Sequence, residues 1–390
     1  MSNMYARMRR DFAQDPDGAR QCAQRLIDIR KRQTPLRTRK CDSSLLLATW
    51  NLRDFDSNKF GYGPRRTESL YYIAEMLSCF DLIAVQEINR DLTAWEKVMA
   101  ILCREWDYIA TDTTKGAGGN DERMVFVYNT EKIWFRKIAG EIVLPKDELI
   151  KAEKASKKSV TIPENATGTG VPLANVFEEV QFARSPFMVA FQSGWFRFSL
   201  CTAHLYYGAA SGPKLQQRIA EIQALVKFFA DRQDKVSKQE RDRHGQVENY
   251  IILGDFNVVK PDHDTMRALK SNGFVVPDAI DGDKVRKEGN HYYDQIAVRV
   301  KDPRFKVLGG GMLQMYEDVF RDEDFALYKD ALPKADPEGE GEFNAKTPEA
   351  IYKKWRTWQM SDHHPLWIEI ATDFSDQYLS DVAAGKLFAG

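Results

Sequence analysis

Short apolar runs alternate along the chain with longer amphipathic segments. The run Leu45-Leu46-Leu47-Ala48-Thr49-Trp50 is typical of a strand that is buried on both faces. Similar runs predict further strands at 81–86, 124–128, 133–135, 187–203 (two strands around Ser193-Gly194), 250–253, 295–298 and 366–370. Amphipathic spacing predicts helices over 17–32, 64–80, 95–106 and 215–231. Strands interrupted by a few helices indicate an α/β or α+β fold, and this pattern leaves the order of the strands open.

Two polar stretches interrupt this pattern. Residues 144–185 are rich in Lys and then in Pro and Gly, and residues 329–350 contain Pro333, Pro337, Gly339 and Gly341. Long segments without regular structure are uncommon inside a compact domain. We therefore expect insertions near 144–185 and 329–350.

Charge is distributed unevenly along the 390 residues. Residues 1–40 carry eleven Lys and Arg against four Asp and Glu, a net charge of +7, which leaves −8 for the rest of a chain whose total is −1. The basic segment could contact a polyanion or form a solvated helical extension. The acidic remainder suits a metal site built from carboxylates.

The composition narrows the cellular setting. Of the residues, 43% are hydrophobic, and no run reaches the roughly 18 apolar residues that would span a membrane. The first residues do not resemble a signal peptide, so we expect a cytoplasmic protein. The five cysteines are odd in number and none are spaced as Cys-x-x-Cys, so neither a disulfide framework nor a structural zinc site is expected.

Polar residues of catalytic type stand at the ends of the predicted strands. They are Asn51, Glu87, His204, the segment Gly254-Asp255-Phe256-Asn257, Asp294, and Ser361-Asp362-His363-His364-Pro365. Apolar strands that end in carboxylates, amides and imidazoles indicate a site at one rim of packed sheets.

The set Trp50-Asn51, Gln86-Glu87, His204-Leu205, Gly254-Asp255-Phe256-Asn257, Asp294 and Ser361-Asp362-His363 with Pro365, in this order, resembles the endonuclease/exonuclease/phosphatase superfamily with its deoxyribonuclease-like fold. The resemblance extends from about Ser44 to Ile370. It implies a four-layered α/β/β/α sandwich with two packed mixed sheets, and a single catalytic domain over 44–372. Residues 1–43 would then be a basic helical extension and 373–390 a C-terminal tail.

The resemblance also implies phosphoester hydrolysis with Mg²⁺ or Mn²⁺. Glu87 would be the principal metal ligand, with Asn51 beside it and Asp362 as a further ligand. Hard cations of this kind prefer oxygen ligands.

The remaining roles are carried over from the family in the same way. Asp255 would place or deprotonate the attacking water, Asn257 would bind the phosphate, and His204 would contact the phosphate and protonate the leaving group. Asp294 would hold the ring of His363. Arg123, which follows the glycine-rich segment 116–119, would reach a phosphate or lie at a loop end, and His364 is expected to be a neighbour rather than a catalyst.

Three functions compete for this site. The first is an endonuclease acting on DNA, with Arg65 and Arg66 contacting the nucleic-acid backbone and with neither a membrane nor an obligate protein partner. The second is a phosphatase or phosphodiesterase for a small-molecule or lipid phosphoester, and the third is a binding protein without activity. The block Asn290-His291-Tyr292-Tyr293-Asp294-Gln295 differs from the Pro-Ala-Trp-Cys-Asp-Arg block of inositol-phosphate phosphatases, and Gln295 also replaces the Arg that commonly follows this Asp.

Overall fold

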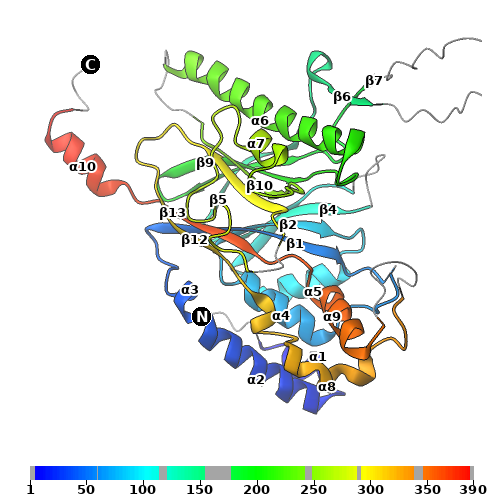
Figure 1. The fold of residues 1–390 in the computed structure, drawn as a ribbon. Helices are drawn as coiled ribbons and strands as arrows, with labels where there is room; N and C mark the ends of the chain where they lie inside the picture. Colours follow the sequence, from blue (N-terminus) through cyan, green and yellow to red (C-terminus); the bar gives the residue numbers. More distant parts are fainter. Residues whose placement is uncertain are drawn as a thin grey trace, which may run out of the picture.

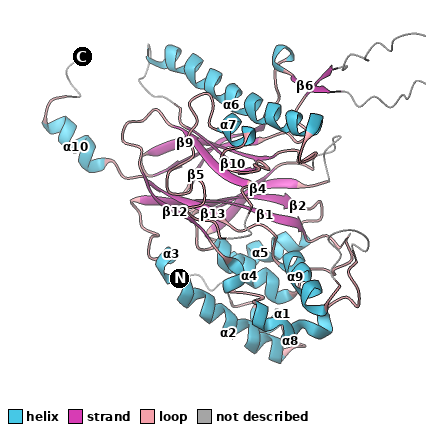
Figure 2. Cartoon of the chain, in the orientation of Figure 1, coloured by secondary structure: helices cyan, strands magenta, loops and turns pink. Residues whose placement is uncertain are grey.

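Two β-sheets pack face to face, and helices cover their outer faces (Figure 1; Figure 2). This arrangement comes from a computed structural model that describes residues 5–58, 60–113, 121–153, 177–241, 248–287, 291–337 and 346–386. The glycine-rich segment 116–119 and most of the insertion expected at 144–185 lie outside these residues, as do 338–345 of the second insertion. The α/β sandwich of two mixed sheets expected from the sequence is confirmed.

The first sheet has the strand order β12-β13-β1-β2-β4-β3. Its strands are β1 (Ser44–Phe55), β2 (Leu82–Ile88), β3 (Trp106–Ala110), β4 (Arg123–Asn129), β12 (Val307–Met312) and β13 (Leu366–Ala371). Strands β1 and β2 are parallel, and the other neighbours are antiparallel.

The second sheet has the order β11-β10-β9-β8-β5. Its strands are β5 (Trp134–Glu141), β8 (Phe187–Ser193), β9 (Phe196–His204), β10 (Tyr250–Asp255) and β11 (Asp294–Arg299). Here β9 and β10 are the parallel pair. A separate hairpin joins β6 (Ile150–Glu153) to β7 (Phe177–Val180).

Strand alternation divides the apolar residues between two cores. Leu45 and Leu47 of β1 face the second sheet, while Leu46, Ala48 and Trp50 face the helices on the other side. Successive side chains of a strand point to opposite faces, so a continuous apolar run fills both cores. This explains why β1 lacks a polar face.

Helices form the two outer layers (Figure 1). Those on the first sheet's side are α1 (Met8–Asp11), α2 (Pro16–Arg32), α3 (Thr34–Arg37), α4 (Thr67–Leu77), α5 (Thr93–Leu102), α8 (Phe325–Tyr328) and α9 (Pro348–Gln359). On the second sheet's side lie α6 (Gly212–Arg241) and α7 (Asp264–Leu269), and α10 (Ser375–Ala383) projects from the body. Short 3-10 turns span η1 (Lys146–Glu148), η2 (Met315–Glu317), η3 (Asp322–Asp324) and η4 (Lys329–Ala331).

The basic N-terminal segment packs against the helical layer. Cys22, Leu26 and Ile29 of α2 are buried in the same core as the side chains of α4. Its cations pair with carboxylates of the body: Arg25 with Asp324, Arg30 and Arg37 with Glu75, Arg32 with Asp318, Arg39 with Glu369, and Lys40 with Asp81. These contacts give part of the positive charge a structural role.

Three helices differ in length from the sequence prediction. Helix α4 begins at Thr67 rather than Pro64, because Arg65 donates to the carbonyls of Leu52 and Met360 and Arg66 is extended. Helix α5 ends at Leu102, where Cys103 takes a positive φ of 70°. Helix α6 continues to Arg241 through residues that are polar but include neither Gly nor Pro. Among the described residues, no helix combines the length and apolar character needed to cross a bilayer.

Candidate active site

The predicted catalytic residues meet where the two sheets approach each other at one rim. Within the second sheet, Asp255 pairs in register with His204 of β9 and with Asp294 of β11. In the first sheet, Asn51 pairs with Gln86, next to Glu87. Strand register therefore places five of the predicted residues at neighbouring strand ends.

Hydrogen bonds connect the two sheets beneath this rim. The amide nitrogen of Gln86 donates to the hydroxyl of Thr202 (2.8 Å), and that of Asn51 donates to Asp255 Oδ2 (3.2 Å). All four side chains are buried. Because buried polar groups are costly without partners, these bonds fix the relative position of the two halves of the site.

Glu87 and Asn51 form one side of the site. Asn51 Nδ2 donates to Glu87 Oε1 (2.8 Å), and the backbone N–H of Asp54 donates to Glu87 Oε2 (2.6 Å). Glu87 has a φ of 62°, a left-handed conformation that is uncommon outside glycine. Such strain persists where surrounding contacts enforce it, as the hydrogen bonds from Asn51 and Asp54 do here.

Asp255 lies between two histidines. Its Oδ2 atom is 3.8 Å from Nε2 of His204 and 3.8 Å from Nε2 of His363. His363 Nδ1 is 2.7 Å from Asp294 Oδ2, so the predicted contact between these two residues is present in the structure. The His363 carbonyl also accepts a hydrogen bond from the indole of Trp50 (2.9 Å).

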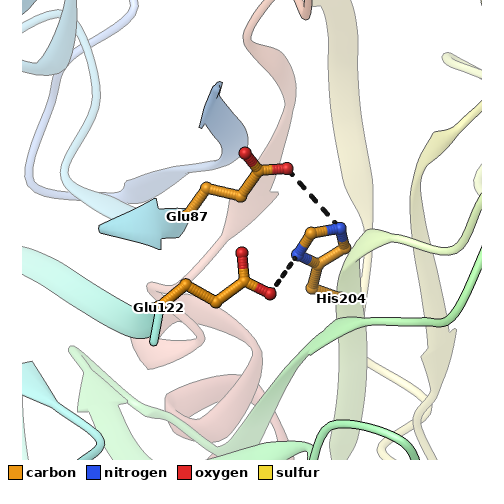
Figure 3. A group of neighbouring side chains, drawn as sticks. All are labelled: Glu87, Glu122 and His204. Carbon is orange, nitrogen blue, oxygen red and sulfur yellow. Dashed lines mark ion pairs between the residues drawn. The ribbon is translucent and has the colours of Figure 1, made fainter. Parts of the chain in front are cut away.

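His204 has its own carboxylate, which the sequence analysis missed. Glu122 Oε1 lies 3.1 Å from His204 Nδ1, while Nε2 of the same ring is 3.6 Å from Glu87 Oε1 (Figure 3). Arg184 pairs with the same oxygen of Glu122. Each histidine therefore has one nitrogen beside a buried carboxylate and the other directed toward the centre of the site.

The surroundings shift the protonation of these groups. Burial raises the pKa of Glu87 above its ordinary value, and the charges of Glu122 and Asp362 add to this effect against that of His204. Burial alone would lower the pKa of each histidine. For His204 the carboxylates of Glu122 and Glu87 outweigh it and raise the pKa, and for His363 Asp294 does so more strongly.

Backbone geometry explains why the segment Gly254-Asp255-Phe256-Asn257 needs its first residue. Gly254 has a φ of 131°, and a Cβ atom there would lie 2.1 Å from the carbonyl oxygen of Ala203 on β9. Only glycine allows this close approach. Asn257 follows with a φ of 49°, and its amide donates to the Leu205 carbonyl (2.8 Å).

Asp362 lies at the exposed edge of this centre. It is 44% exposed, its Oδ1 lies 4.0 Å from Nε2 of His363, and its Oδ2 lies 3.5 Å from Nε of Arg53, whose guanidinium also stacks on Trp358. Arg123 donates to the Arg90 carbonyl (3.1 Å) and lies 3.7 Å from Asp112. Arg184 lies beside the catalytic groups, where it pairs with Glu122 and lines the cavity.

The prediction that Arg65 contacts a nucleic-acid backbone is wrong. Its side chain is buried, and it donates to the carbonyls of Leu52, Arg53 and Met360. Arg66 pairs with Glu68. The Nδ1 atom of His364 accepts a hydrogen bond from the backbone N–H of Met315 (3.3 Å).

A cavity of about 460 Å³ opens over these groups. Its walls come from both sheets and from the segments that follow β9 and precede β11: Glu87, Arg184, His204, Tyr206, Tyr207, Gly208, Asp255, Asn257, Tyr293 and His363. The three tyrosines were not among the predicted site residues, since aromatic residues in loops have no distinctive sequence spacing.

The donor set fits a hard divalent cation. Among the described residues, Glu87, Glu122 and His204 form a group whose ligand atoms lie within 4.8 Å of one another. Glu87 and the amide oxygen of Asn51 are the kind of ligands that Mg²⁺ prefers, whereas the contact of Glu122 with His204 suits a carboxylate–histidine pair. Burial and the charges of Glu122 and Asp362 raise the pKa of Glu87, and a cation here would offset both effects.

Comparison with known proteins returns structures and no sequence relatives. No protein-family model matches the chain, and neither does any curated protein. Similar solved structures include an endonuclease/exonuclease/phosphatase family protein from Bacteroides thetaiotaomicron (18% identity over 85% of this chain and 96% of that chain, TM-score 0.46). A mannosyl-6-phosphatase from the same organism (18%, 84% and 99%, TM-score 0.45) and the human nocturnin catalytic domain with bound sulfate (11%, 85% and 94%, TM-score 0.49) are also similar.

These three TM-scores lie below 0.5 and the identities below 20%, so the likeness assigns neither an activity nor a substrate. The two packed mixed sheets, and the strand register that brings Asn51, Glu87, His204, Asp255 and Asp294 to one rim, agree with the fold that the resemblance to the endonuclease/exonuclease/phosphatase superfamily implies.

Proposed function

We propose that the protein is a divalent-metal-dependent phosphodiester hydrolase that cleaves DNA endonucleolytically by in-line attack of water. The observation that carries this proposal is the position of Asp255, whose Oδ2 lies 3.8 Å from each of two imidazole nitrogens. Each ring has a carboxylate at its other nitrogen. This arrangement supplies one acceptor and two potential donors around a single reacting group.

The side chains have separate tasks in this reaction. Asp255 accepts the proton of the water whose oxygen forms the new bond to phosphorus. His363, whose pKa Asp294 raises, donates to a phosphoryl oxygen as negative charge develops there. His204 gives its proton to the ester oxygen that leaves when the old P–O bond breaks, and Asn257 binds the phosphate through its amide.

Glu87 and Asn51 would hold Mg²⁺ or Mn²⁺, which supplies Lewis-acid stabilisation of charge on the phosphoryl and leaving oxygens. Glu122 keeps the orientation of His204 independent of that ion. Arg184, which pairs with Glu122 and lines the cavity, adds positive charge beside the phosphate position.

A second candidate is hydrolysis of a small-molecule or lipid phosphoester. The observation that favours it is the size of the cavity, about 460 Å³, which is within the range of small-ligand sites. The two candidate functions use the same reacting groups and differ in the part of the substrate that is attached to the phosphate.

A nicking assay on supercoiled plasmid tests the proposal. We expect cleavage with Mg²⁺ or Mn²⁺, loss of cleavage in excess EDTA, and a loss of roughly 100-fold or more in Glu87→Gln, because the metal loses its principal carboxylate. Glu141→Gln, at an exposed strand end, is the matched control and should cleave normally.

Intact plasmid at high enzyme concentration, together with rapid release of phosphate from a small monoester, would refute the endonuclease and support the second candidate. Undiminished cleavage after exhaustive chelation would contradict metal dependence.

A further inference from the structure

The wall of the active-site cavity is aromatic as well as polar. Tyr206, Tyr207 and Tyr293 line it together with the histidines and carboxylates. The Tyr293 ring lies 5.9 Å from the ring of His363, and the rings of Tyr207 and Tyr293 are 6.5 Å apart. The phosphate chemistry described above uses none of these tyrosines.

Tyr293 is held in place from one side. The imidazole of His291 stacks on its ring with a centroid distance of 4.4 Å and an interplanar angle of 2°. The next residue, Asp294, begins β11, so the backbone of Tyr293 is fixed at the sheet edge. The Phe256 backbone N–H also donates to the Tyr293 carbonyl (2.9 Å).

Tyr207 is held by a buried cation. Arg218 of α6 is fully buried and donates to the carbonyls of Tyr207 and Ala209, and also to that of Asn257 (2.8 Å). Its guanidinium lies 4.6 Å from the centre of the Tyr207 ring, while that side chain is 47% exposed. An exposed aromatic ring on a loop that is fixed to the phosphate-binding Asn257 is therefore positioned rather than loose.

We propose that Tyr207 and Tyr293 form a stacking surface for a nucleobase next to the scissile phosphate, and that the preferred substrate is single-stranded nucleic acid. This inference rests on the nuclease activity proposed above. An aromatic side chain stacks on any base, because every base has a π face. A base in a duplex already stacks on its neighbours, so placing it on a tyrosine costs unstacking energy that a single strand does not require.

Cleavage of labelled oligodeoxynucleotides with Mg²⁺ tests the stacking surface. The first substrate is a single strand with a base on every residue. The second is a matched single strand with abasic residues on both sides of a central phosphodiester bond. Tyr293→Ala should lower kcat/KM at that bond by about 5- to 150-fold on the base-containing strand, which is the range expected for one lost stacking contact. It should leave the abasic strand almost unaffected, and Tyr293→Phe, which keeps the ring, should remain near wild type.

Tyr207→Ala provides a second variant, in which the lost side chain is 47% exposed, and it should show the same pattern as Tyr293→Ala. Tyr378→Ala, on the projecting helix α10, is the control and should leave kcat/KM unchanged for both substrates. We also expect wild type to cut the single strand faster than the same sequence in a duplex.

Equal losses on base-containing and abasic strands would overturn the stacking surface, as would a Phe variant as slow as the Ala variant or a duplex cut as fast as a single strand. In those cases the nuclease proposal survives. If wild type cuts no oligonucleotide and no plasmid, both proposals fail.

Discussion

Asp255 lies between two histidines, and each histidine has another carboxylate at its other ring nitrogen. His204 lies between Glu122 and Glu87, and His363 lies between Asp294 and Asp255, with Nε2 of both rings 3.8 Å from the same Asp255 oxygen. A carboxylate at Nδ1 fixes the tautomer and favours the protonated ring. The site therefore holds two donors of similar construction around one acceptor.

The pair formed by Asp294 and His363 should behave as one unit. His363→Ala is expected to lower turnover by ~10²–10⁴, the usual effect of removing a positioned acid or base. Asp294→Asn should cause a loss of the same order, because the ring loses the partner 2.7 Å from Nδ1. The double variant should be little slower than His363→Ala.

A double-mutant cycle on kcat with plasmid DNA measures this coupling. Multiplicative losses would show that Asp294 and His363 act independently. Glu122→Gln offers a parallel cycle with His204→Ala, for which the 3.1 Å contact leads us to expect the same non-additivity.

At this scale, the site residues that could be predicted from the sequence are those at the ends of predicted strands. Asp255 and His204 each end a buried strand, and register alone brings them together. Glu122 was missed because it precedes β4, and its partner His204 is distant in the chain. The adjacent Arg123 was predicted to be a site residue, and its guanidinium contacts the Arg90 carbonyl and Asp112.

At the scale of elements, the helical layer contains carboxylates with little or no exposure that depend on the N-terminal segment. Glu75 of α4 has no exposed surface and accepts hydrogen bonds from Tyr5 and Arg37. Asp318 and Asp324 pair with Arg32 and Arg25 of α2. The sequence predicted α2 because its amphipathic spacing is local, but the partners of its cations are distant in sequence and could not be read from it.

Arg37→Met should destabilise the protein by about 3 kcal/mol, because it leaves the buried Glu75 without its closest cation. Arg20→Met is the matched control. Its partner Asp17 is on the same helix, both side chains are largely exposed, and such pairs contribute little.

Chemical denaturation of the two variants measures this difference. Equal midpoints would mean that the ion pair between Arg37 and Glu75 adds no net stability. We expect deletion of residues 1–40 to prevent folding, because it removes Cys22, Leu26 and Ile29 from the core.

At the scale of the whole molecule, several carboxylates lie close together where the two sheets meet. Glu87, Glu122 and Asp255 surround His204, and the charges of Glu122 and Asp362 contribute to the raised pKa of Glu87. Holding these groups together opposes folding unless a cation offsets their repulsion. Active sites commonly reduce stability in this way.

Metal binding should therefore stabilise the folded protein. At a free Mn²⁺ concentration 100 times the dissociation constant, linkage predicts ~2.7 kcal/mol of added stability. For a chain of 390 residues this corresponds to an increase in Tm of about 3 °C, on the usual entropy of unfolding per residue.

Glu87→Gln should remove most of this increase, and it should also raise the Tm of the metal-free protein, because one negative charge leaves the cluster. Differential scanning calorimetry with EDTA and with Mn²⁺ compares the four conditions, and Glu141→Gln should match wild type in both. A metal-free Glu87→Gln protein that melts below wild type would show that the hydrogen bonds from Asn51 and Asp54 to Glu87 outweigh the repulsion.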